Sequence, residues 1–115
     1  MTLTMSADVT EADFESVAER ALLSLRDALD ALSLDCEIEL AMGILSIEFA
    51  DGAKYIINSH RAARQIWMAA ELTAWHFDPE ADGTWKAKKS GDELRSALGS
   101  VLTKKLGRPV SIVPA

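Results

Sequence analysis

The hydrophobic pattern of this chain changes its period twice, and this change constrains the fold more than any other feature. Between residues 11 and 32, apolar residues recur at three- and four-residue steps, which predicts an amphipathic helix. From residue 35 onward, apolar and polar residues alternate, which is typical of strands with one buried face. From residue 90 the helical spacing returns. The expected order is therefore a helix, a run of strands and a second helix.

Turn signals divide the middle of the chain into short strands. Apolar and acidic residues alternate over 35–40, and Gly43 marks the turn to a strand over 45–49. Asp51-Gly52 predicts a hairpin, because both residue types tolerate positive φ. Four further strands are expected, over residues 55–58, 65–70, 73–77 and 84–87.

The order of these elements predicts the fold class. Helices at the two ends of a run of about six strands indicate an α+β fold, a two-layer α/β sandwich with two helices packed on one face of an antiparallel sheet. The other face of the sheet is expected to stay in solvent. Thr10 with Asp13, and Ser90 with Glu93, each resemble a capping box at a helix start. On length alone, residues 1–115 are expected to form a single domain.

Negative charge is concentrated in the first third of the chain. The net charge is −6, and the segment from Asp8 to Glu39 carries −8, because only two arginines oppose its ten acidic residues. This asymmetry favours cations or a basic partner and argues against nucleic acid, whose phosphates need a basic surface. A solvated helix face that only keeps the protein in solution would give the same pattern.

The usual catalytic motifs are missing from the sequence. There is no glycine-rich phosphate loop, no H-E-x-x-H and no C-x-x-C. Cys36 is the only cysteine, so neither an intramolecular disulfide nor a multi-cysteine metal site can form. His60, in an expected loop, and His76, in an expected strand, are interpreted as structural or exposed. No apolar run approaches the roughly 20 residues of a membrane helix, and residues 1–9 resemble no targeting signal, so a cytoplasmic protein is expected.

Two groups of side chains remain as candidates for function. The first consists of the carboxylates on the polar side of the first helix and along the first strand. Carboxylate oxygens suit magnesium, calcium, manganese and iron, but carboxylates spread over a surface would bind them weakly and at several places. The second is Trp67. If Ile66 and Met68 face the core, Gln65 and Trp67 project from the open face of the sheet, where an exposed indole is typical of a binding hot spot. The opposite register, with Trp67 buried, is left open.

Several segments resemble the frataxin family, in particular its bacterial CyaY-like branch. The signature Q-I-W-M over 65–68 is similar to the family's Gln-(Ile/Val)-Trp-Leu, and the segment before it ends in the family's asparagine, Asn58. The resemblance covers nearly the whole chain, in order and with family-like spacing. The other segments that carry it are D-C-E-I (35–38), G-I-L-S-I (43–47), D-G-A-K-Y-I-I-N (51–58) and W-H-F-D (75–78).

The resemblance implies an iron-binding protein that regulates iron–sulfur cluster assembly, as an iron donor or regulator, by docking on a cysteine desulfurase and on the scaffold protein. Iron, ferrous or ferric, would be weakly bound by six carboxylates, which we call the acidic ridge: Glu15, Glu19, Asp27, Asp30, Asp35 and Glu37. Asn58, Gln65 and Trp67, on the open face of the sheet, would contribute to docking. Arg20, Leu23 and Ala31 stand where relatives often carry acids, so this ridge is expected to be thinner than theirs.

The remaining expectations concern activity and assembly. The resemblance implies no enzyme, although weak ferroxidase activity has been attributed to some relatives. A monomer is expected, with iron-induced oligomers as a further state, and neither nucleic acid nor a membrane is expected as a partner. The alternative function is an acidic protein-interaction module with no physiological metal role.

Overall fold

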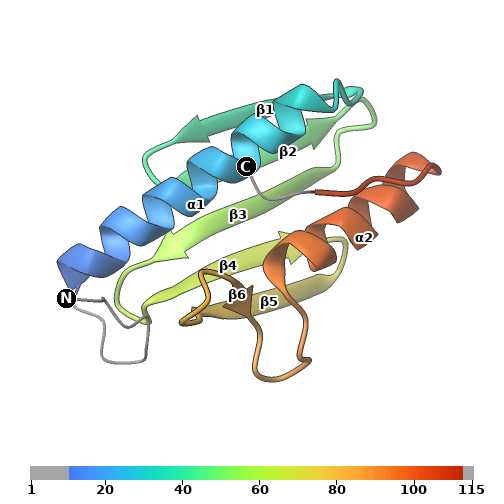
Figure 1. Ribbon diagram of the computed structural model, residues 1–115. Coiled ribbons are helices and arrows are strands. Elements are labelled where there is room, and N and C mark those ends of the chain that lie inside the picture. The colour runs from blue at the N-terminus through green and yellow to red at the C-terminus, as the bar shows by residue number, and fades with distance from the viewer. Residues whose placement is uncertain (1–10, 113–115) are drawn as a thin grey trace.

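The computed structural model describes residues 11–112, which form two helices and six strands (Figure 1). In chain order, the elements are α1 (Glu11–Ala31), β1 (Cys36–Ala41), β2 (Ile44–Phe49), β3 (Lys54–His60), β4 (Gln65–Ala70), β5 (Thr73–Pro79), β6 (Trp85–Lys86) and α2 (Leu94–Leu106). Neither helix is both long enough and apolar enough to cross a membrane.

The six strands form one sheet in the order of the chain, and every neighbouring pair is antiparallel. Both helices lie on the same face of this sheet, and α1 runs along β1, β2 and β3 (Figure 1). The α+β sandwich expected from the sequence is therefore confirmed. The last strand is shorter than expected, because only Trp85 and Lys86 pair with β5.

One hydrophobic core fills the space between the helices and the sheet. Strand residues at alternate positions face it, and the intervening residues face the open side of the sheet. Phe14 of α1 packs edge-on against Trp85 of β6, with ring centroids 6.0 Å apart and an interplanar angle of 76°. This contact joins α1 to β6, the strand at the edge of the sheet opposite β1.

The start of α2 differs from the expectation. The capping box predicted for Ser90 and Glu93 is wrong, because α2 begins at Leu94 and Glu93 itself is the N-cap. The Glu93 carboxylate accepts hydrogen bonds from the backbone N–H groups of Arg95 and Ser96. Ser90 instead accepts a hydrogen bond from the backbone N–H of Asp92, within the preceding turn. The other predicted box involves Thr10, which lies outside the described residues.

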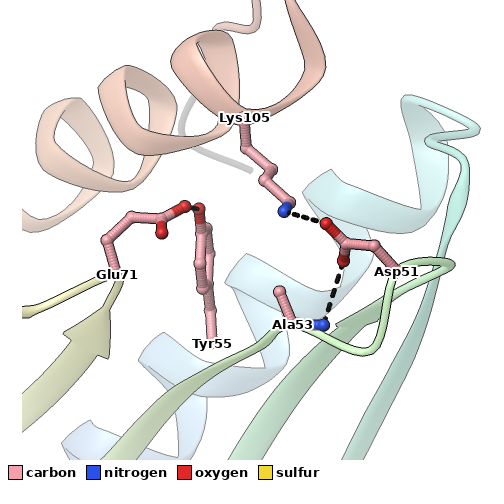
Figure 2. A network of polar contacts seen from close by, with 5 residues as sticks. All are labelled: Asp51, Ala53, Tyr55, Glu71 and Lys105. Carbon is pink, nitrogen blue, oxygen red and sulfur yellow. Dashed lines mark hydrogen bonds and ion pairs between the residues drawn. The ribbon is translucent and has the colours of Figure 1, made fainter.

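A polar network closes the end of the sandwich where α2 terminates (Figure 2). Lys105 of α2 lies 2.5 Å from Asp51 in the β2–β3 turn, with its ammonium 5.3 Å from the centre of the Phe49 ring. On the other side of the network, the hydroxyl of Tyr55 donates a hydrogen bond to the Glu71 carboxylate in the β4–β5 turn. The first contact thus joins α2 to the β2–β3 turn, and the second joins β3 to the β4–β5 turn.

This network predicts a specific loss of stability in alkaline solution. Burial, followed by the hydrogen bond to Glu71 and the charge of that residue, raises the pKa of Tyr55 well above its usual value. The unfolded chain ionises its tyrosine near pH 10, so the stabilisation is present below that pH and is lost as the pH rises through the higher pKa of the folded state. Urea unfolding of the wild type, measured at a series of alkaline pH values, should show this fall in the free energy of unfolding.

A Tyr55→Phe variant provides the control, because Tyr55 is the only tyrosine of the chain. The variant should be about 1 kcal/mol less stable at neutral pH, because it lacks the hydrogen bond to Glu71. Its free energy of unfolding should also lack the fall in alkaline solution that comes from the ionisation of Tyr55. If the free energy of unfolding falls equally steeply with rising pH in the two proteins, the loss does not come from Tyr55.

Candidate metal-binding and docking site

The acidic ridge is divided between the helix layer and the sheet. Glu15, Glu19, Asp27 and Asp30 are exposed residues of α1, at spacings that keep them away from the core. Asp35 lies in the connection between α1 and β1. In β1, Cys36, Ile38 and Leu40 pack against the core, so Glu37 between them projects from the open face of the sheet. The ridge therefore passes around the β1 edge rather than running along one surface.

Two members of the ridge form ion pairs. The Glu15 carboxylate lies 2.5 Å from Nε of Arg61, which belongs to the β3–β4 loop. Asp27 lies 3.1 Å from a guanidinium nitrogen of its neighbour Arg26. Exposed pairs of this kind contribute little to stability, but each places a positive charge beside a carboxylate that would otherwise attract a cation. We therefore expect Glu15 and Asp27 to bind metal ions less well than the other four.

The described side chains do not form a closed metal cage. Within residues 11–112, no three His, Cys, Asp or Glu side chains are gathered closely enough to hold a metal ion. Burial, and then the charge of Asp35, raises the pKa of Cys36, so its thiol stays protonated at neutral pH and is a poor metal ligand. The donors that this surface offers are thus exposed carboxylates, which suit hard cations that keep most of their water.

The open face of the sheet carries a second group of residues, centred on Trp67 of β4. Ile66 and Met68 are buried in the core, which confirms the register that places Trp67 on the opposite face. Trp67 is directly opposite Asn58 of β3, and its indole N–H donates to Gln65 at 2.8 Å. The side chains of Asn58, Gln65 and Trp67 therefore lie on one face of two adjacent strands.

Two histidines stack on the faces of the Trp67 indole, an arrangement that sequence reasoning missed. The ring centroids of His60 and His76 lie 3.9 Å and 4.2 Å from that of Trp67, each with an interplanar angle of 16°. His60, expected in a loop, is the last residue of β3. Gln65 completes the arrangement by donating a hydrogen bond to Asp78 at 3.1 Å. The indole is consequently half-buried and fixed in orientation.

This arrangement is suited to recognition rather than to catalysis. The Nδ1 atom of His60 accepts a hydrogen bond from the backbone N–H of Ala63, at 3.3 Å, which ties this ring to the β3–β4 loop. The two imidazoles are separated by the indole and cannot chelate one metal ion together. A rigid aromatic group with polar neighbours binds a partner at low entropic cost, because its rotamer is already fixed.

Comparison with known proteins gives consistent results over most of the chain. The model of the frataxin-like domain matches residues 7–108. The iron–sulfur cluster assembly protein CyaY of Dechloromonas aromatica is 36% identical over 102 residues, which cover 87% of this chain and 95% of that protein. The protein of the same name from Paraburkholderia phymatum is 32% identical over 106 residues, covering 92% of this chain and all of its own.

Solved structures show the same architecture. The frataxin from Psychromonas ingrahamii superposes with a TM-score of 0.84, covering 91% of this chain and 99% of its own, and at 23% identity this similarity concerns the fold. A trimeric frataxin from the yeast Saccharomyces cerevisiae, complexed with ferrous iron, superposes with a TM-score of 0.61 at 28% identity, covering 91% of this chain and 89% of that one.

Proposed function

Because the chain belongs to the frataxin-like family, we propose that it regulates iron–sulfur cluster assembly by binding iron and docking on a cysteine desulfurase. The curated relatives are iron–sulfur cluster assembly proteins, and the family acts by binding rather than by catalysis, so the protein is not an enzyme. In this role iron is a cargo or a signal, and the assembly machinery is the partner.

The observation that carries the proposal is the segregation of charge. Exposed carboxylates cover the outer side of α1 and continue onto β1, whereas the indole and amide groups occupy the open face over β3 and β4. We infer that the acidic ridge binds iron weakly and attracts a basic surface of the desulfurase. Asn58, Gln65 and Trp67 would add contacts with the desulfurase or the scaffold protein. Metal and partner then share part of one surface, so that each can alter the binding of the other.

An anaerobic titration with ferrous iron, followed by amide NMR, tests the metal part of this proposal. We expect selective broadening at the acidic ridge, strongest near Glu19, Asp30, Asp35 and Glu37, because Glu15 and Asp27 already have arginine partners. Calcium and magnesium, titrated separately, show how far the site discriminates among hard cations. Broadening spread evenly over all exposed acids would argue against a defined site.

A pair of variants sharpens this experiment. Replacing Glu19 and Asp30 together, by Glu19→Gln and Asp30→Asn, should weaken the apparent iron affinity several-fold, because two of the carboxylates without an arginine partner on α1 lose their charge. The matched control is Glu80→Gln, in the loop before β6 at the other edge of the sheet, which should leave the titration unchanged.

The alternative function, an acidic interaction module without a metal role, predicts a different result. In that case no residue would broaden below millimolar iron, while binding to the desulfurase would persist and weaken with added salt. Sedimentation with and without iron would show in the same samples whether the protein stays monomeric or forms iron-induced oligomers.

A further inference from the structure

The outer edge of β1 has no strand beside it within residues 11–112. β1 is the first strand in the order of the sheet, so one side of its backbone points away from β2. The opposite edge is formed by β6, which has only two residues and is bridged through Lys86 to Glu93. β1 has six residues and is therefore the longer of the two edges (Figure 1). A long unpaired edge offers backbone N–H and C=O groups to an additional strand.

The core-facing side chains of β1 are incompletely covered. Those of β2 are at most 5% exposed, whereas those of β1 are half-buried although they belong to the same core. Leu32 and Leu34, in the connection that leads into β1, are also partly exposed, Leu32 at 37%. These residues form what we call the apolar shelf, along the edge of the sandwich: Leu32, Leu34, Cys36, Ile38 and Leu40. A strand added to β1 would cover the shelf with every second side chain.

The open face beside this edge has the opposite character. Glu37 of β1 lies directly opposite Glu48 of β2, and Lys54 of β3 is opposite Glu48 on its other side. Glu39 lies two residues further along β1 and faces Ser46. These side chains line a shallow hollow in the open face. Three carboxylates with one ammonium leave an excess of negative charge, and like charges on directly opposed residues destabilise a strand pair.

We propose that the β1 edge binds an extended segment of a partner protein in which apolar residues alternate with lysine or arginine. Backbone hydrogen bonds would join the segment to β1, its apolar side chains would cover the shelf, and its basic side chains would lie over Glu37 and Glu39. This inference rests on the docking role proposed above but does not depend on iron. It identifies the kind of segment that the partner would provide.

The same charges argue against a second copy of this chain as the occupant. If two β1 strands paired antiparallel about Ile38, Glu37 of each copy would lie opposite Glu39 of the other. Such a pair would place four carboxylates together on one face, which is unfavourable. Acidic residues on an edge strand thus prevent self-association while leaving the edge available to a basic strand.

A synthetic peptide tests this directly, with no desulfurase present. The peptide is as long as β1, has blocked termini and alternates lysine with valine. We expect it to shift the amide NMR signals of β1 and to slow hydrogen exchange on the outer side of that strand. A peptide of the same composition with its lysines and valines in two blocks should bind about tenfold more weakly, because it cannot place all its valines on the shelf. A peptide N-methylated on the amides that would face β1 should lose binding to a similar extent.

A variant of the protein tests the contribution of its acidic side chains to peptide binding. E37Q combined with E39Q should weaken binding of the alternating peptide about tenfold at low salt. The variant should remain folded, because it removes the repulsion between Glu37 and Glu48. Equal binding of all three peptides would overturn the proposal, as would a shift confined to α1. Dimerisation of the protein through β1, in place of peptide binding, would assign the edge to a second copy and would also overturn it.

The outcome is separable from that of the proposed function. If the alternating peptide fails to bind while the protein still docks on the desulfurase through the open face or α1, only the strand-addition inference falls. If the peptide binds but desulfurase does not, the docking partner proposed above is wrong, and the edge binds a basic strand from another source.

Discussion

Replacing Trp85 with alanine is expected to lower the free energy of unfolding by about 3–5 kcal/mol, the range for large aromatic side chains removed from a core. Trp85 is 2% exposed, and its ring meets that of Phe14, which is completely buried. Since domains of this size are stable by only about 5–15 kcal/mol, the variant would lose a large part of its stability. Urea unfolding, monitored by circular dichroism, measures the change.

The effect should depend on ring volume rather than on the indole N–H. A Trp85→Phe variant keeps an aromatic ring against Phe14 and should recover more than half of the loss. Trp75, whose indole N–H donates to Asp92 at the surface, offers a comparison, and Trp75→Ala should cost clearly less because that ring is only partly buried. A Trp85→Ala protein as stable as Trp75→Ala would show that β6 is not fixed by the core.

The fold could be predicted because apolar and polar residues alternate along the strands, and this alternation determines which side chains face the core. Placing Ile66 and Met68 in the core was enough to put Gln65 and Trp67 on the open face, since a slip of one residue would have exposed both apolar side chains. The expected bounds of β4 agree with those observed for the same reason. Where the periodic signal was weak, as over 84–87, the strand proved shorter than expected.

The start of α2 could not be read from the sequence alone. Ser90 and Glu93 have the spacing of a capping box, but Gly91 adopts a positive φ of 80° and belongs to the turn before the helix. The backbone N–H of Gly91 donates to the carbonyl of Ala87, which fixes this turn. Glu93 was therefore left to cap the helix with its own carboxylate. Spacing identified the residues, whereas the hydrogen bonds of the turn before the helix decided their roles.

The candidate site was only partly predictable for a similar reason. The acids of α1 follow from helical spacing, but the pairing of Glu15 with Arg61 joins residues from α1 and the β3–β4 loop. The histidine stack on Trp67 likewise combines side chains of three strands. His76 could have been anticipated, because the sheet register places it directly opposite Trp67. His60 could not, since it was expected in a loop and stacks diagonally from the end of β3.

Replacing Trp67 with alanine is expected to weaken docking on the cysteine desulfurase by about 30-fold or more, which corresponds to a hot-spot loss of about 2 kcal/mol. The reason is geometric, because the two histidines and Gln65 hold the indole ready for contact. Binding measured by calorimetry gives the change, and a thermal unfolding curve verifies that the variant is folded. Leu72→Ala is the matched control, because Leu72 is a fully exposed apolar residue in the β4–β5 turn, away from the Trp67 cluster.

Salt separates the contribution of Trp67 from that of the acidic ridge. Added salt screens exposed charges, so the penalty of Glu19→Gln with Asp30→Asn should shrink as the ionic strength rises. The penalty of Trp67→Ala should change little, since it comes from packing and hydrogen bonding rather than from net charge. If both penalties shrank together, the indole would act only through the charged groups around it. If Leu72→Ala weakened docking as much as Trp67→Ala, the open face would not be the docking surface.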